Sequence, residues 1–141
     1  RAQYIDTGKI HWIVLNASDD PSEAFTPVFA IARWAQQQGR YWDILDTLFQ
    51  VAHRPPSFQA DLVARGGVLE RAGVEACLRD RAVRAAVDAD FADYLRLKLR
   101  GTPGFVVSKT ARDGSRTGAI IAGAQTLEYF QRVFDELLKT P

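Results

Sequence analysis

The sequence predicts one α/β domain that is mostly helical, and three patterns indicate this class. Residues 9–15 form an apolar run with the character of a buried strand, since both faces are apolar except at His11. Two short apolar runs near the C-terminus flank an Asp-Gly pair, as in a β-hairpin. Between the first run and the hairpin, apolar residues recur at helical spacing.

Composition narrows the class of protein and its partners. The chain has 141 residues, the length of one ordinary domain, and 47% of them are apolar, which is typical of a folded domain. A formal net charge of +1 gives no electrostatic reason to expect nucleic acid or a membrane surface as a partner. No apolar run approaches the roughly 18 residues of a membrane span. One cysteine excludes an internal disulfide, and we expect neither a metal site nor a cofactor.

The first 21 residues are expected to contain a helix end, a strand and a turn. Residues 1–6 should be the tail of a helix, which Thr7 and Gly8 terminate with glycine in its favoured C-terminal position. The strand then covers residues 9–15. Residues 16–21 are polar and should form a turn.

Five helices are expected in the central block. The first has Thr26 as its N-cap and Pro27 in its first turn, and it should run to about Gln38 and stop at Gly39. The remaining helices should cover residues 41–52, 59–72, 74–80 and 81–99, with Gly73 separating the two short ones.

Helical spacing also predicts which side chains these helices bury. The face of the helix at 41–52 should be formed by Trp42, Leu45 and Phe49. The buried stripe of the helix at 81–99 should be formed by Val83, Val87, Phe91, Tyr94 and Leu95.

The C-terminal part should be a hairpin followed by a helix. Its strands are expected near residues 104–108 and 117–121, with the turn at Asp113-Gly114. The last helix should turn five apolar residues to the core: Leu127, Phe130, Val133, Phe134 and Leu137.

Pro103 stands where an apolar strand begins, in the run Gly101-Thr102-Pro103-Gly104-Phe105. Proline lacks a backbone donor and is tolerated only where the ladder has not begun. X-Pro bonds are also the only peptide bonds that become cis at low cost, about 0.5–1 kcal/mol. The local sequence alone fits an ordinary proline at a strand start as well as a cis-proline in a binding loop.

The order of elements and the residues at their joints resemble the DsbA-like thiol–disulfide oxidoreductases, a branch of the thioredoxin superfamily. The resemblance covers nearly the whole chain and lies in several short segments rather than one decisive motif. These segments are Tyr4–Ile10, Ala30–Ala35, the Gln38–Asp43 corner with Leu48-Phe49, Ala76–Leu78 and Gly101–Phe105. It implies a thioredoxin-like fold with a helical insertion at about 27–99.

The resemblance also implies which residues bind and which are missing. Gly101, Thr102, Pro103 and Gly104 would form a cis-proline loop that presents backbone to protein thiols or extended peptides, with Gly104 leaving the strand mouth open. The family's first strand and its Cys-x-x-Cys helix would precede residue 1, so we expect a non-catalytic part of a longer oxidoreductase. That strand would lie between residues 9–15 and the hairpin, where another segment or a second chain could also fill the sheet. The implied compartment is the periplasm or another extracytoplasmic space.

Two other functions remain open on the sequence. One is a redox-inactive thioredoxin-like module for peptide or protein binding. The other is a glutathione-dependent isomerase or transferase of the kappa type, which shares the helical insertion. No residue of the chain is assigned a catalytic role.

The remaining singular residues have ordinary structural interpretations. Cys77 is expected to be a buried, inert thiol. His11 should be a core histidine and His53 a surface one. The three tryptophans should line the core or a groove: Trp12, Trp34 and Trp42.

Overall fold

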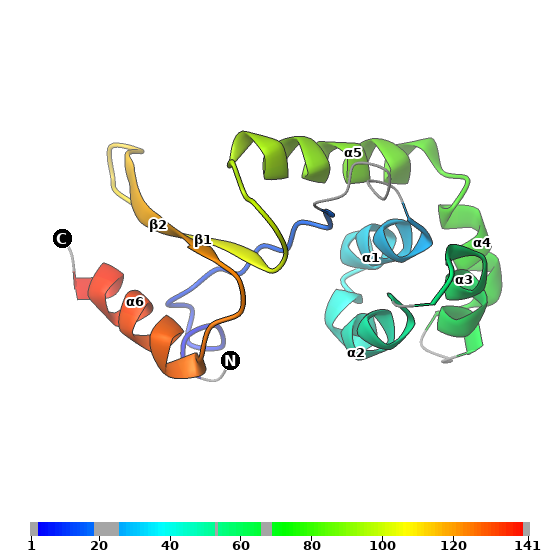
Figure 1. Cartoon of the computed structure of the whole chain (residues 1–141), viewed down its shortest axis with the longest axis horizontal. Coiled ribbons are helices and arrows are strands. Elements are labelled where there is room, and N and C mark those ends of the chain that lie inside the picture. The colour runs from blue at the N-terminus through cyan, green and yellow to red at the C-terminus, as the bar shows by residue number, and fades with distance from the viewer. Residues whose placement is uncertain (1–2, 19–25, 53, 66–68, 140–141) are drawn as a thin grey trace. The chain divides into compact units, whose positions relative to one another are not determined.

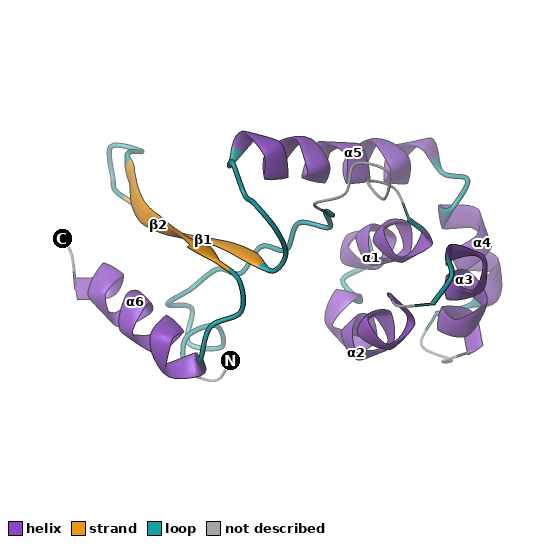
Figure 2. Ribbon diagram, viewed as in Figure 1, coloured by secondary structure: helices purple, strands orange, loops and turns teal. Residues whose placement is uncertain are grey.

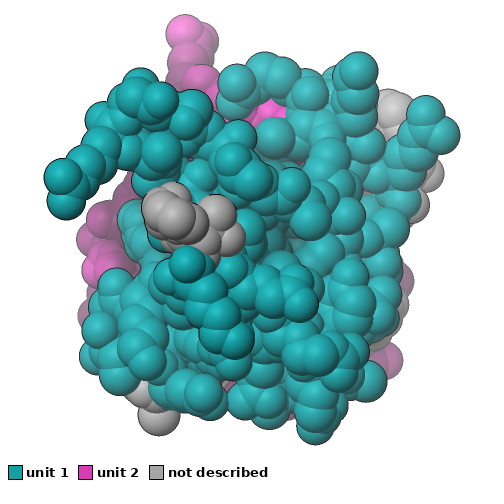
Figure 3. All heavy atoms as spheres, turned by 90° about the vertical axis from the view of Figure 1, so that its left-hand side faces the viewer, with its two compact units in different colours: residues 1–14, 95–141 teal, residues 15–94 magenta. Residues whose placement is uncertain are grey.

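The computed structural model describes residues 3–18, 26–52, 54–65 and 69–139. The chain divides into two compact units, coloured separately in Figure 3: unit 1 is residues 1–14 and 95–141, and unit 2 is residues 15–94. The regular elements of unit 2 in its described part are all helices, and they take in most of the predicted insertion at 27–99. That the two units make one domain stays a prediction.

Six helices and one hairpin make up the described structure (Figures 1 and 2). The elements in chain order are α1 (Pro27–Gln37), α2 (Tyr41–Ala52), α3 (Pro56–Arg65), α4 (Arg71–Cys77), α5 (Arg81–Arg96), β1 (Gly104–Thr110), β2 (Arg116–Ala122) and α6 (Leu127–Lys139).

Helix α1 begins and ends as its sequence predicts. The Thr26 side chain accepts a hydrogen bond from the Phe29 N–H, so it satisfies one of the unpaired donors of the first turn. Pro27 occupies the first turn, where a missing N–H costs nothing. Gly39 has φ +69°, a left-handed conformation that glycine adopts without steric cost, and it ends the helix.

Unit 2 has an apolar core of its own. Ile31 of α1 and Ile44 of α2 are completely buried, and helices α3 to α5 add small and branched side chains around them. The core consists of Val28, Ala30, Ile31, Ala32, Ala35, Ile44, Leu48, Val51, Val63, Leu69, Val74, Cys77 and Val83.

The structure corrects the predicted face of α2. Its buried residues are Ile44, Leu48 and Val51, whereas Trp42 is 47% exposed and Phe49 is 67% exposed. The helix carries two apolar stripes, and helical spacing alone does not decide which of them packs against α1.

Helix α5 and the helix break before α4 also differ from expectation. In α5 the prediction is confirmed for Val83, Val87 and Tyr94, but the buried stripe includes Asp90, and Leu95 is exposed.

Gly73 does not separate two helices but lies inside α4. A Cβ at Gly73 would lie 2.8 Å from the Trp34 ring, so this glycine allows close helix packing instead of breaking the chain.

Unit 1 is built on the predicted hairpin. Strands β1 and β2 pair antiparallel, with Phe105 opposite Ile121 and Val107 opposite Ala119. The Asp113 side chain accepts hydrogen bonds from the backbone N–H and hydroxyl of Ser115, at 2.9 and 2.6 Å. Gly114 has φ +83°, which the predicted Asp-Gly turn requires.

Helix α6 packs on the hairpin through aromatic contacts. The Phe130 ring lies 4.8 Å from the Phe105 ring and 5.9 Å from that of Phe134, which in turn meets Tyr4 at 5.2 Å. The predicted inner face of α6 is therefore right in part. Four of its five members are half-buried, but Leu127 is 66% exposed.

The predicted strand at residues 9–15 is wrong. In the described structure this segment belongs to no sheet, and the only strand pairing is between β1 and β2. Trp12 and Ile13 are exposed, as is His11, which we expected in a core. An apolar, β-prone sequence forms a strand only where another strand pairs with it in a ladder, and no described strand pairs with this segment.

The segment before residues 9–15 agrees with its prediction only at the glycine that terminates it. Residues 3–9 form turns rather than the expected regular helix. The Gly8 N–H donates to the Ile5 carbonyl and the Lys9 N–H to the Tyr4 carbonyl, both at 2.9 Å. Gly8 has φ +71°, so the expected glycine termination is present as a Schellman-type pattern.

Candidate functional site

The four residues predicted to bind substrate lie together in the loop between α5 and β1. The Thr102–Pro103 peptide bond is cis, and both of these residues are exposed. Gly101 has φ +103°, which side-chain-bearing residues rarely adopt. The Pro103 carbonyl accepts a hydrogen bond from the Gly123 N–H at 2.9 Å, so the loop joins the hairpin directly. The role of these four residues in binding stays a prediction.

Gly104 has a different structural role from the one expected. We expected its small size to leave the strand mouth open. A Cβ at this position would lie 3.2 Å from the Gly101 carbonyl oxygen and 3.3 Å from Leu99 Cδ2. The glycine therefore lets the loop fold back closely on itself, and the space beside it is already occupied.

The strand that follows the loop has one edge without a strand partner. The Gly123-to-Pro103 bond and the Ala111-to-Ser115 bond are hydrogen-bonded positions of the hairpin, and such positions alternate along an antiparallel pair. The backbone N–H and C=O groups of the intervening β1 residues therefore point away from β2. These residues are Gly104, Val106, Ser108 and Thr110, and no strand of the described chain pairs with them.

The single cysteine is buried, as expected, and its thiol is unreactive at neutral pH. Cys77 lies in α4 with 2% of its surface exposed, and its thiol donates to the Val74 carbonyl at 3.1 Å. Burial, and next the negative charge of Asp80, raise the pKa of the thiol to about 11. At neutral pH it holds its proton, so it supplies no thiolate nucleophile.

No metal-binding cluster of histidine, cysteine or carboxylate side chains occurs among the described residues. His11 lies in unit 1, and His53 lies outside the part that the structure describes.

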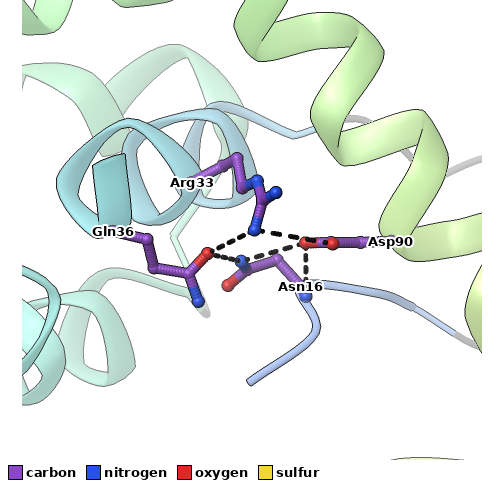
Figure 4. A network of polar contacts seen from close by, with 4 residues as sticks. All are labelled: Asn16, Arg33, Gln36 and Asp90. Carbon is purple, nitrogen blue, oxygen red and sulfur yellow. Dashed lines mark hydrogen bonds and ion pairs between the residues drawn. The ribbon is translucent and has the colours of Figure 1, made fainter. Parts of the chain in front are cut away.

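A buried polar network in unit 2 was not predicted (Figure 4). Asp90 of α5 accepts hydrogen bonds from the Asn16 backbone N–H at 3.1 Å and from its side-chain amide at 3.3 Å. Arg33 of α1 lies 3.7 Å from the same carboxylate and donates to Gln36 at 3.0 Å. The network fixes the chain at Asn16 to two helices of unit 2.

The contacts of this network indicate a structural role. Asp90 is 5% exposed, and its carboxylate is satisfied by an amide, a backbone N–H and a guanidinium, as a buried charge requires. The sequence held one signal for it: Asp90 falls on the helical stripe of Val83, Val87 and Tyr94.

The elements of unit 1 define a class of protein. A hairpin whose first strand follows a cis-proline and whose last strand leads into a C-terminal helix, with a helical block inserted before it, is a thioredoxin-like arrangement. A family profile described as thioredoxin matches residues 1–135. The chain therefore belongs to the thioredoxin family. Searches of curated proteins and of solved structures gave no significant match. None of the helices in the described residues is long and apolar enough to cross a membrane.

Proposed function

We propose that the loop Gly101–Gly104 and the outer edge of β1 bind an extended peptide segment. The observation that carries the proposal is the row of outward backbone groups along β1, from Gly104 to Thr110. An added peptide strand satisfies such a row through main-chain hydrogen bonds, and alternate side chains then supply specificity. Left bare, an edge of this kind favours aggregation, which is a further reason for it to have an occupant.

The binding part belongs, in this proposal, to a DsbA-like thiol–disulfide oxidoreductase. The order of elements and the short segments that resemble this family support the assignment. The loop would hold a protein substrate while a dithiol carried outside these 141 residues exchanges with its thiols or disulfide. Such exchange persists in oxidising compartments, so the proposal places the protein in an extracytoplasmic space.

The binding step is tested by titrating the 141-residue chain with an unstructured ten-residue peptide and following its backbone amide NMR signals. We expect the signals of Gly101, Gly104 and Val106 to shift in a saturable way. Val106→Pro removes an outward donor without breaking the ladder to β2, so it should abolish the shifts. Ile120→Pro is the matched control, because Ile120 lies opposite Val106 and its N–H points to the other edge of the hairpin.

Equal loss of binding in the two proline variants, with both folded by circular dichroism, would contradict use of the β1 edge. If a second copy of the chain fills this edge instead, sedimentation will show a dimer that Val106→Pro dissociates and Ile120→Pro does not.

The oxidoreductase assignment needs its own test. Fusing a thioredoxin-type strand and Cys-x-x-Cys helix before residue 1 should give insulin reduction, and Val106→Pro should lower it.

A redox-inactive binding module is the second candidate, favoured by the buried Cys77 thiol. It predicts peptide binding that survives Cys77→Ala and no reductase activity in the fusion.

A further inference from the structure

The two units carry opposite charge. Unit 1 has ten basic and five acidic residues, a formal net charge of +5, and unit 2 has eight basic and twelve acidic residues, a net charge of −4. One unit is therefore strongly basic although the net charge of the whole chain is close to zero. This basic unit contains the Gly101–Gly104 loop. Charge of one sign around a binding loop attracts ligands of the other sign.

The acidic residues of unit 1 already have partners. Asp113 accepts two hydrogen bonds from Ser115, and Asp135 accepts one from the Tyr4 hydroxyl at 2.9 Å. Glu128 lies at the start of α6, where backbone and Thr126 hydrogen bonds lower the pKa of its carboxyl group. The two other acidic residues, Asp6 and Glu136, also have interaction partners.

Two basic residues directly before the loop are placed differently. Lys98 and Arg100 are exposed and alternate with the half-buried Leu97 and Leu99. In the part of the chain that the structure describes, neither cation makes an ion pair. Arg100 lies three residues before Pro103 and Lys98 five, so the two cations directly precede the proposed peptide site in the chain.

Lys98 also occupies a backbone position that does not suit it. Its φ is +55°, and its N–H donates to the Leu95 carbonyl at 3.0 Å where α5 ends. Glycine is the favoured residue in this left-handed position, because any side chain there adds steric cost. A lysine is present although glycine would suit the backbone better, which points to a use for its ammonium group.

We propose that Lys98 and Arg100 make the Gly101–Gly104 loop selective for extended peptides that carry acidic side chains. The inference rests on the proposed peptide-binding function and names the substrate class for it. Each cation would meet a carboxylate of the bound segment at the exposed rim. Rim charges of this kind act mainly on association rate and selectivity, and salt weakens them.

The test compares two ten-residue peptides that are identical except for two glutamates replaced by glutamines. The full chain should bind the glutamate peptide about three- to tenfold more tightly at low salt, as expected for two exposed charge pairs. Raising the salt to about 0.5 M should remove most of the difference. Equal binding of the two peptides would overturn the selectivity but leave the peptide site standing, whereas no binding of either would overturn both.

Variants locate the effect. Lys98→Gly and Arg100→Gln should each lower the preference for the glutamate peptide about two- to threefold. Lys139→Gln is the matched control, since Lys139 is exposed at the last residue of α6, about 18 Å along that helix from Leu127, and is no part of the proposed site. An equal loss in the control would show a general charge effect and overturn the assignment to Lys98 and Arg100.

Lys98→Gly separates binding from folding. It should weaken binding of the glutamate peptide while keeping or raising Tm, because glycine fits the left-handed backbone better. A lower Tm in this variant would mean that the ammonium group acts within the folded chain, and would overturn its proposed role.

Discussion

Unit 2 has an apolar core of its own, whereas unit 1 has a strand edge whose backbone groups pair with no other described strand. In unit 2 thirteen apolar residues form one buried cluster, and its buried carboxylate Asp90 is fully engaged. In unit 1 only Tyr4 and Ile121, among the described apolar residues, are buried, and one edge of β1 has no strand partner. A row of outward backbone groups, in the same unit as an exposed apolar segment, suits a site that binds a partner, while a closed core suits a scaffold.

The largest expected effect lies in the core of unit 2. Ile31→Ala removes a completely buried side chain and should lower the free energy of unfolding by about 2–5 kcal/mol. Ile13→Ala is the matched change in unit 1, where the side chain is 73% exposed, and it should stay within about 0.5 kcal/mol. Urea unfolding followed by circular dichroism measures both.

A large loss of stability in Ile13→Ala would break the comparison. It would mean that residues 9–15 are covered in solution, by a second copy or by another segment. Sedimentation of the same variant would then separate these two explanations.

A smaller effect is expected where unit 2 satisfies a buried charge. Asp90→Ala leaves the buried Asn16 N–H without its acceptor and Arg33 without its ion-pair partner, and should cost about 1–3 kcal/mol. Asp88→Ala is the control one half-turn away, since the ion pair of Asp88 with Arg84 is exposed on both sides and should contribute less than about 0.5 kcal/mol. Thermal unfolding of the two variants in the same buffer measures both losses of stability. Similar losses would contradict a structural role for the network.

Local patterns predicted most of the fold. Helix α2, the cap at Thr26 and the Asp-Gly turn of the hairpin follow from residues close in sequence, and they are present. The errors concern contacts between distant residues. The sequence around Gly73 predicts a helix break until Trp34 is known to pack against it. Residues 9–15 have the pattern of a strand, although no described strand pairs with them.

The candidate site divides in the same way. The position of Gly101–Gly104 between a helix and a strand was predictable, because proline and glycine punctuate the chain there. The unfilled edge of the hairpin was expected from the family resemblance alone, whereas the register that turns Gly104, Val106, Ser108 and Thr110 outward is a property of the folded sheet. The charge of +5 on unit 1 was not predictable, since it requires knowing that residues 1–14 and 95–141 fold together.

The smallest expected effect at neutral pH concerns Cys77, and it probes how tightly unit 2 is closed. The thiol should resist modification by a water-soluble disulfide reagent at pH 7–8, because its pKa is about 11 and it is buried. A thiol whose pKa is higher in the folded state than in the unfolded chain stabilises the fold fully below the unfolded pKa, and this contribution is lost as the pH rises through the folded one. Stability should therefore fall between about pH 9 and pH 11, where the unfolded chain has already lost its thiol proton. Cys77→Ala should flatten that part of the stability curve, and rapid labelling of the wild-type thiol at pH 7 would show that unit 2 opens far more readily than its core suggests.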